Sequence, residues 1–472
     1  MKVSIMSLFF VSILLVSLSV HAAEPVVVKL QPGQNLCSTE ELRLPVSAES
    51  VILNPQMNPQ MFSSWAEVFQ AHPNKLDYLL VPGDYTSWGP VSLLNKSGTL
   101  NRKRTIRYYD PATSHLHPVQ RNQEARIDTI SAPQIGTAHW LIHGLTIRQP
   151  SAAVQFGNDT HNITFDSMLI EESRVYGLRI RSAKDICIQN SVIRNAPIEA
   201  QRDSTGISIK PALYKPVSRI KILDNEIYNY GDAIQITDHG PNPADSWVPI
   251  ENVLIENNDL YLTNDRRQAD GTACAENGID IKAGSDNAYT RVYGNRMWGF
   301  RKTDTACAGS GSNGDAMVLH VAIRRIEIER NIIGEAPVGI KEKLFLSPTN
   351  TYLSRYIKAN NNYFYNIQKY HVDDSGAVLD LSNNVSFISN VVAQGDYLFD
   401  HSNDGGYHLG GPDVRGTLSI SVGVNDPASN DPIPVPYDVS INYVKDESKA
   451  VAYIYERRRW TGPEWHVIER GY

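Results

Sequence analysis

Apolar and polar residues alternate through most of the chain in short runs that recur in pairs. The first run of each pair reads apolar, polar, Asn, any residue, apolar, as in IQNSV, ILDNEI and VYGNRM. Alternation with a period of two is typical of a half-buried β-strand, and helical periodicity is weak throughout. The recurring asparagines are Asn190, Asn225, Asn258, Asn295, Asn331, Asn362 and Asn390, with Ser167 in the matching place one repeat earlier.

The second run of each pair begins with Gly or Ala and reads GLRIR, GISIK, AIQIT, GIDIK and AMVLH in successive repeats. The repeat interval is 23 to 37 residues, and no helical segment separates the strands. This pattern predicts an all-β chain folded as a right-handed parallel β-helix, a solenoid whose coils stack on one another. The asparagines would then form a ladder at a turn, because Asn tolerates left-handed backbone and its amide can bond the next Asn.

Changes in composition divide the chain into four parts. Residues 1–22 carry Lys2, an apolar run and small residues at the end, which is typical of a cleaved signal peptide, so we expect a secreted or periplasmic protein. Residues 23–135 are predicted to form an N-terminal cap and the first coils, and residues 136–400 the catalytic core of the β-helix. Residues 401–472 are rich in Gly, Pro, Asp and Tyr and are predicted to form a C-terminal β-rich cap or a small β unit.

Four cysteines are present, and an oxidising compartment permits disulfides. Cys274 and Cys307 flank neighbouring loops and are candidates for one bridge. Cys187 lies in an apolar strand, and we expect it to be a buried thiol. The spacing of the cysteines fits no zinc site.

The alternation also places cations on one outward face. In GIDIK, Ile279 and Ile281 would point into the coil, and Asp280 and Lys282 out of it. The same register turns a set of basic residues outward on neighbouring coils: Arg179, Arg181, Lys210, Lys282, His320, Lys341 and Lys343.

The formal net charge is −7 over 472 residues, so this basic stripe is local and gives no general footprint for nucleic acid. Stacked coils lie about 5 Å apart, which brings these cations close together. We expect the partner to be an anionic polysaccharide lying along the stripe of a monomer. We expect no nucleic-acid partner and no membrane span.

Carboxylates gather near the same strands, at Asp232, Glu276, Asp280 and Asp315. Oxygen-rich groups of this kind can hold Ca²⁺, which would bridge the carboxylate of a uronate sugar to the protein. The plainer alternative is that Asp232 and Asp315 are turn residues and that Asp280 is a salt-bridge partner of Lys282.

Lys282 is the candidate base, because cationic neighbours would lower its pKa, although Asp280 acts in the opposite direction. His320 or Arg301 would neutralise charge or protonate the leaving oxygen, and Arg291 and Arg296 would pair with a sugar carboxylate. An ordinary surface lysine and a structural histidine remain open alternatives for Lys282 and His320.

The stretch ENGIDIKAGSDNAYTRVYGNRMWGF resembles the right-handed β-helix polysaccharide lyases of the alginate and chondroitin type, and less closely the pectate lyases. The resemblance implies Lys282 as the Brønsted base and Glu276 as a Ca²⁺ ligand. The family's acid is an arginine on the next coil, where this chain reads MVLHVA and offers Leu319 or His320.

The function expected from these features is cleavage of a uronate-containing polysaccharide by β-elimination. A uronate C5-epimerase on the same fold is an alternative, because it begins with the same proton abstraction. A non-catalytic glycan-binding solenoid is a second alternative.

Overall fold

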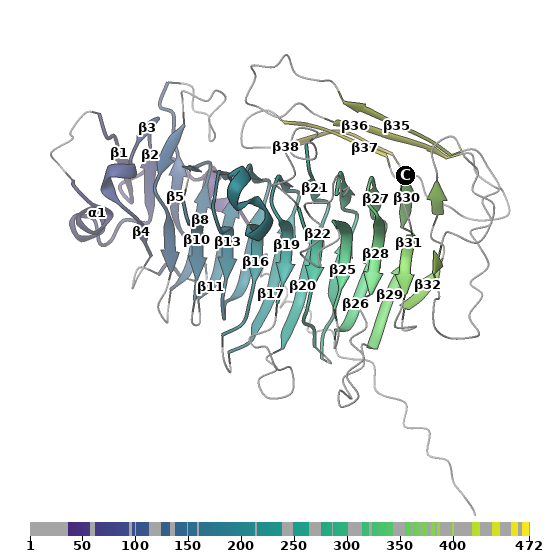
Figure 1. Cartoon of the computed structure of the whole chain (residues 1–472). Coiled ribbons are helices and arrows are strands. Elements are labelled where there is room, and N and C mark those ends of the chain that lie inside the picture. The colour runs from purple at the N-terminus through teal and green to yellow at the C-terminus, as the bar shows by residue number, and fades with distance from the viewer. Residues whose placement is uncertain are drawn as a thin grey trace, which may run out of the picture.

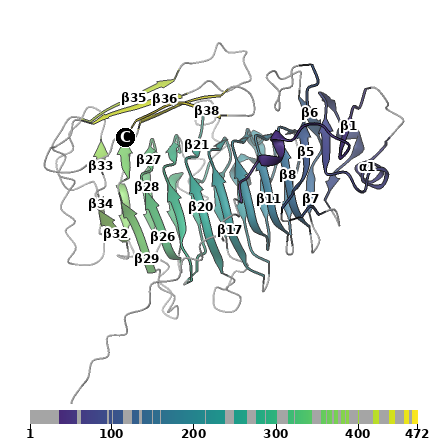
Figure 2. The same cartoon turned by 180° about the vertical axis from the view of Figure 1, so that it is seen from behind.

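The chain winds into a long solenoid whose coils each contribute one strand to each of three parallel sheets (Figures 1 and 2). The structure is a computed structural model. It describes residues 36–56, 62–93, 97–99, 101–112, 124–132, 137–148, 150–157, 160–212, 215–237, 249–263, 275–285, 287–300, 314–320, 323–342, 355–360, 362–365, 367, 370–374, 379–382, 385–387, 399–400, 418–424, 437–443, 455–460 and 465–471.

The described residues form parallel sheets of 12, 11 and 11 strands, and from β2 onward each sheet takes every third strand of the chain. The first sheet contains β1 (Ser50–Leu53), β2 (Asp77–Leu80), β5 (Arg104–Tyr108), β8 (Ala138–His143), β11 (His161–Asp166), β14 (Lys184–Gln189), β17 (Val217–Leu223), β20 (Ile250–Glu256), β23 (Thr290–Tyr293), β26 (Arg324–Glu329), β29 (Arg355–Asn360) and β32 (Leu379–Ser382). The second contains β4 (Val91–Ser92), β7 (Ile130–Ala132), β10 (Ala152–Phe156), β13 (Tyr176–Ile180), β16 (Thr205–Ile209), β19 (Asp232–Ile236), β22 (Asn277–Ile281), β25 (Asp315–Leu319), β28 (Val338–Glu342), β31 (Tyr370–Asp374) and β34 (Phe399–Asp400). The third contains β3 (Gly83–Asp84), β6 (Ala125–Ile127), β9 (Thr146–Arg148), β12 (Leu169–Glu171), β15 (Val192–Arg194), β18 (Glu226–Tyr228), β21 (Asp259–Tyr261), β24 (Arg296–Trp298), β27 (Ile332–Gly334), β30 (Tyr363–Tyr365) and β33 (Val385–Phe387). The right-handed parallel β-helix expected from the sequence is therefore confirmed.

The core is a stack of aliphatic side chains inside the coils. Ile207, Ile234, Ile279 and Met317 occupy one register position on successive strands of the second sheet, and all are fully buried. Burying a side chain of this size stabilises the fold by about 1.5–3 kcal/mol. The small residue that opens each second run is needed for close approach, because a Cβ on Gly278 would lie 2.6 Å from the carbonyl oxygen of Ala316 in the next coil.

An asparagine ladder runs along one turn of the solenoid, as expected, but the residue that precedes Asn225 in it is not the predicted one. The side-chain Nδ2 of Asn225, Asn258, Asn295 and Asn331 each donates to the Oδ1 of the next asparagine, at 2.9–3.0 Å, and the ladder ends at Asn362. Ser191, not Asn190, takes the preceding place, and its backbone amide donates to Asn225 Oδ1 at 3.0 Å. Asn190 instead occupies the left-handed turn position, with φ of 51°. Asn390 lies outside the described residues.

The first coils are closed by a short helix and an N-terminal strap. Helix α1 (Trp65–Ala71) begins at the N-cap Ser64, whose side chain accepts from the amide of Glu67, and buries Trp65, Val68 and Phe69. The N-terminal strap, residues 36–44, includes the 3₁₀ helix η1 (Glu40–Arg43) and contacts the first sheet. Shorter 3₁₀ turns are η2 (Thr86–Trp88) and η4 (Ile198–Asp203).

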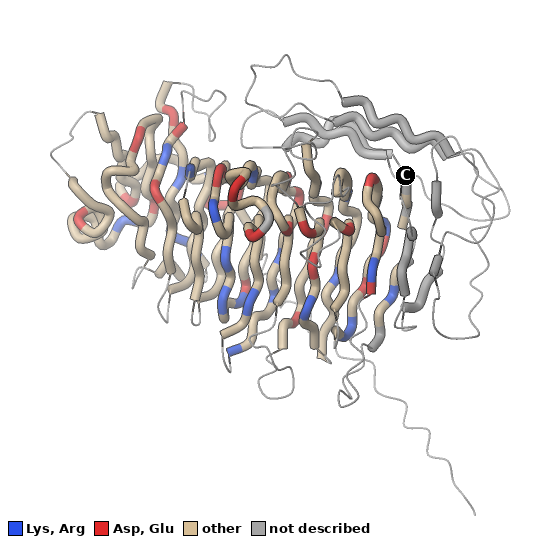
Figure 3. Tube along the Cα trace, in the orientation of Figure 1, with Lys and Arg blue, Asp and Glu red and all other residues tan. Residues whose placement is uncertain are grey.

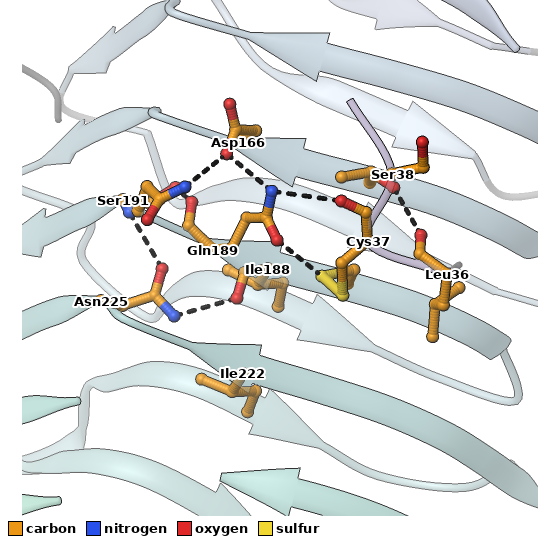
Figure 4. The surroundings of a disulfide bond; sticks show 12 residues. Leu36, Cys37, Ser38, Asp166, Ile188, Gln189, Ser191, Ile222 and Asn225 are labelled. Carbon is orange, nitrogen blue, oxygen red and sulfur yellow. Dashed lines mark hydrogen bonds between the residues drawn. A yellow bond between two sulfur atoms is a disulfide. The ribbon is translucent and has the colours of Figure 1, made fainter. Parts of the chain in front are cut away.

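A disulfide between Cys37 and Cys187 fastens the strap to β14, across 150 residues of sequence (Figure 4). The expectation that Cys187 is a free thiol is therefore wrong. Its side chain points out of the coil, because the inward positions of β14 belong to Ile186 and Ile188. Gln189 donates to the carbonyl of Cys37 at 3.4 Å and to Asp166 at 2.9 Å, which fixes the strap further. Cys274 and Cys307 lie outside the described residues, as does the signal peptide predicted at 1–22.

Beyond the solenoid, β35 (Leu418–Val424), β36 (Tyr437–Tyr443), β37 (Tyr455–Trp460) and β38 (Trp465–Gly471) form an antiparallel sheet of their own. The change from parallel to antiparallel pairing coincides with the change in composition after residue 400. In the described part of the chain, no helix has the length and apolar character needed to span a membrane.

Candidate functional site

The outer face of the second sheet carries the residues that the sequence predicted to face outward. Cα pairing aligns one position of β13, β16, β19, β22, β25 and β28 in a single row: Arg179, Ser208, Gln235, Asp280, Val318 and Lys341. The predicted register of these strands is therefore confirmed. Acidic and basic residues both run along the solenoid rather than gathering at one end (Figure 3).

A second row follows two residues later, where each strand ends. The backbone amides of Lys210, Thr237, Lys282 and His320 each donate to a carbonyl of the preceding coil, at 2.7–2.9 Å. Because this bonding continues the ladder, side chains two residues apart share the outer face. Lys282 is thus on the same side of the solenoid as Lys210 and His320, with its side chain 32% exposed.

Asp280 lies at the centre of a three-residue cluster, which we term the Asp280 cluster: Asp280, Lys282 and His320. Lys282 Nζ lies 2.6 Å from Asp280 Oδ2, and His320 Nε2 lies 2.9 Å from Asp280 Oδ1. The carboxylate is 1% exposed, whereas the imidazole is 21% exposed. One buried carboxylate therefore orients two partly exposed proton-carrying groups on neighbouring coils.

The surroundings of Asp280 and Lys282 favour the charged form of each side chain. Burial opposes ionisation of Asp280, but the hydrogen bond from His320 and the charge of Lys282 hold the pKa of this carboxyl below its ordinary value. Burial likewise opposes the charge of Lys282, but the Asp280 carboxylate raises the pKa of the amine above its ordinary value. The balance left open by the sequence is therefore decided in favour of a charged lysine.

A second carboxyl, Asp232, lies on the neighbouring coil. Asn277 Nδ2 donates to its Oδ1 at 3.0 Å and Gln235 Nε2 to its Oδ2 at 2.7 Å. The same Gln235 amide lies 3.4 Å from Asp280 Oδ2 and so links the two acids. Burial, followed by repulsion from Asp280 and Glu276, raises the pKa of Asp232 well above its ordinary value.

These partners bear on the predicted calcium site. Asp280 faces an amine and an imidazole, Asp232 faces two amide donors, and Asp315 Oδ2 lies 3.5 Å from Lys341 Nζ. These neighbours are N–H donors, whereas Ca²⁺ takes six to eight oxygen ligands. Among the described residues no group of three or more His, Cys, Asp and Glu is arranged to hold a metal ion. The N–H donors around Asp232, Asp280 and Asp315 do not favour a cation there, and the calcium site predicted from the sequence stays untested.

Two predicted substrate-binding arginines lie on other sheets. Arg291 belongs to β23 of the first sheet, and its Nε donates to Glu327 at 2.7 Å. Arg296 belongs to β24 of the third sheet, where it is buried against Asp259. The structure therefore does not bring these two arginines to the Asp280 cluster. Arg301 and Lys343 lie outside the described residues.

Sequence reasoning missed the roles of Gln235 and Asn277. Both share register positions with the predicted acids, Gln235 with Asp280 and Asn277 with Asp232. That shared position was the available signal, because outward residues at one position of adjacent coils are neighbours in a parallel β-helix.

No protein-family model and no curated protein matches the chain. Solved structures do resemble it. The A-module of a mannuronan C-5 epimerase from Azotobacter vinelandii is 15% identical, with a TM-score of 0.42, over 70% of this chain and 91% of that one. A polygalacturonase from Erwinia carotovora ssp. carotovora is 12% identical, with a TM-score of 0.35, over 74% and 94%. An alginate lyase from Paenibacillus sp. str. FPU-7 is 13% identical, with a TM-score of 0.32, over 74% and 97%. At such identities the similarity is one of fold alone.

Proposed function

We propose that this protein is an exported polysaccharide lyase that cleaves a uronate-containing chain by β-elimination at the Asp280 cluster. The observation that carries the proposal is the buried Asp280 carboxylate, which has a partly exposed imidazole and a partly exposed ammonium beside it on one sheet face. The signal-peptide pattern of residues 1–22 and the Cys37–Cys187 disulfide support export, because disulfides persist in oxidising compartments.

His320 is assigned as the base. His320 Nε2 lies 2.9 Å from Asp280 Oδ1, so a neutral imidazole with its proton on Nε2, facing this carboxylate, carries its lone pair on Nδ1. A base oriented by a carboxylate in this way is ready to take a proton from substrate. The proton removed is that on C5 of the uronate, next to the sugar carboxylate.

Lys282 is assigned as the cation and proton donor. This changes the role expected from the sequence, because pairing with Asp280 raises the pKa of the amine and keeps it charged. Positive charge there would stabilise the enolate-like state that forms as the C5–H bond breaks. The C5–H electron pair then forms the C4–C5 double bond, the C4–O4 bond breaks, and the departing O4 takes a proton from Lys282.

The geometry supports elimination over epimerisation. His320 and Lys282 stand on adjacent coils of one sheet, about 5 Å apart, and so reach a bound sugar from the same side. Elimination in which the proton and the leaving oxygen lie on one side of the ring needs only that arrangement. A C5-epimerase needs a second proton donor on the opposite side.

The test is incubation of the purified full chain with polymannuronate, polyguluronate, polygalacturonate and chondroitin, followed by ultraviolet absorbance of the unsaturated product. We expect product from at least one polymer, with kcat/KM lowered by about 10²- to 10⁴-fold in His320→Ala. Lys184→Gln, an exposed lysine of β14, is the matched control and should retain full activity. A changed sugar configuration without chain cleavage would instead identify an epimerase. Binding of a polymer with neither change would identify a glycan-binding protein.

A further inference from the structure

Three cations stand apart from the Asp280 cluster on the same face, on coils that precede the cluster in the sequence. We term Arg179, Arg181 and Lys210 the cation triplet. Arg179 is on β13, Arg181 directly follows it, and Lys210 follows β16 on the next coil. All three side chains are partly exposed.

The triplet differs from the other basic residues of this face in lacking acidic partners. Lys282 pairs with Asp280 and Lys341 with Asp315, whereas the triplet forms no ion pair with any acid in the described part of the chain. The triplet occupies two coils about 5 Å apart, where like charges repel, and a bound anion would relieve that repulsion.

The guanidinium of Arg179 is also restricted in position. The Arg179 guanidinium lies over the Tyr176 ring, 4.7 Å from its centroid, and this stacking restricts its rotamers. The Nε atoms of both Arg179 and Arg181 are buried and have no hydrogen-bond partner among the described residues. Guanidinium groups bind carboxylate and sulfate through paired N–H donors, so the exposed ends of these partly exposed side chains match an anionic group.

A neutral polar stretch separates the triplet from the Asp280 cluster. Its members are Ser208, Gln235 and Thr237, and Thr237 Oγ1 is buried without a hydrogen-bond partner among the described residues. Lys210 is two coils from Lys282 and Arg179 is three coils from Asp280, which corresponds to roughly 10 and 15 Å along the stack.

We propose that the cation triplet is a separate anion-binding subsite, which holds a carboxylate or sulfate group of the polysaccharide two to three coils away from the site of cleavage. The proposal rests on the proposed function for the identity of the polymer, but not for the binding itself. It assigns affinity for long chains to the triplet and chemistry to the Asp280 cluster.

The test uses the full chain with Arg179→Gln, Arg181→Gln and Lys210→Gln, singly and together, and a matched triple variant of the first sheet, Lys184→Gln, Lys221→Gln and Lys358→Gln. Polymer binding is measured in a His320→Ala background, so that cleavage does not intervene. We expect each arginine substitution to weaken binding of a long polyuronate by about tenfold, and the matched variant to leave it unchanged. The salt dependence of binding should fall only in the triplet variants.

Kinetics in the wild-type background separate this subsite from the catalytic centre. The triplet substitutions should raise KM for long polymers, leave kcat at saturation unchanged, and leave turnover of short oligomers unchanged. A sulfated, carboxyl-reduced polymer and an unsulfated polyuronate identify which anion is held. Unchanged polymer binding in the triple variant, or an equal fall in kcat, would overturn the subsite. Retained triplet-dependent binding without cleavage of any polymer would support the subsite and reject the lyase.

Discussion

Among the described residues, outward arginines of the third sheet are paired with acidic side chains, whereas several basic residues on the outer face of the second sheet are not. On the third sheet, Arg148 Nε lies 2.7 Å from Glu171 Oε2, and Arg194 Nε donates to Glu171 Oε1 at 2.8 Å. Arg296 is held by Asp259 in the same manner. The described arginines of β9, β15 and β24 are therefore each neutralised by a neighbouring coil.

The same face continues as a stack of aromatic rings. Tyr228 and Tyr261 lie with centroids 4.7 Å apart, and Tyr261 and Trp298 with centroids 4.5 Å apart. These rings are nearly fully buried, although the pleat turns them outward. Burial also raises the pKa of the adjacent Glu226 to about 8, while Tyr261 donates a hydrogen bond to it.

The basic residues of the second sheet named above are partly exposed, and among the described residues the cation triplet has no acidic partner. The comparison teaches that outward charge on a solenoid is informative only together with its partners. Removing one partner of a buried ion pair should destabilise the fold, whereas removing an accessible cation that has no acidic partner should affect ligand binding more than stability.

The largest loss of stability should come from breaking the arginine–glutamate pairs on the third sheet. Glu171→Ala leaves the Arg194 guanidinium buried without its carboxylate, and we expect the free energy of unfolding to fall by about 3–5 kcal/mol. Urea denaturation followed by circular dichroism measures this loss. Glu199→Ala, which removes an exposed partner of Arg174, is the control and should change little. Equal losses of stability in the two variants would show that the buried pair of Glu171 with Arg194 does not stabilise the fold more than an exposed pair.

A smaller and pH-dependent effect should follow from Asp232→Asn. Burial raises the folded-state pKa of Asp232, so its ionisation is disfavoured in the native protein. Its contribution to stability is complete below the ordinary pKa of about 3.9 and falls as the pH rises toward the folded-state value. The variant should therefore melt at a higher temperature than wild type at neutral pH, and the difference should disappear near pH 4.

Thermal melting of the Asp232→Asn variant between pH 4 and 8 tests this sign directly. Asp203→Asn, at an exposed position just before β16, is the control and should show no such trend. A variant that melts lower than wild type at every pH would mean that the hydrogen bonds from Asn277 and Gln235 outweigh the cost of the buried charge.

The smallest effect on stability should come from a substitution in the cation triplet. Arg181→Gln removes one of three neighbouring cations and breaks no ion pair in the described part of the chain. We expect its free energy of unfolding to stay within about 0.5 kcal/mol of wild type. The same denaturation experiment as for Glu171→Ala provides the measurement, and a loss of several kcal/mol would mean that the triplet is structural.

Much of this architecture could be predicted from the sequence, because a period of two fixes which side chains point out and a repeat fixes which coils align. That reasoning placed Asp280, Lys282 and His320 on one face. It misplaced Asn190 by one residue, since Asn is favoured both in the ladder and in the adjacent left-handed turn.

Other features depend on contacts that no periodicity encodes. Alternation could not show that Asp280 is buried although it points outward, nor that this acid holds both Lys282 and His320. It could not show that Arg291 and Arg296 lie on different sheets, because that depends on where each coil turns. The pairing of Cys37 with Cys187 depends on a strap that crosses the coils outside the repeat.

That strap bears on how the molecule withstands damage. In a solenoid each coil touches mainly its neighbours, so loss of structure can begin at an open end and advance coil by coil. A covalent tie from Cys37 to the strand that carries Cys187 joins the edge of the stack to its interior. Fraying or proteolytic nicking at the amino-terminal end would then leave the cut segment attached, and the coils that carry the Asp280 cluster would be protected while the tie is oxidised.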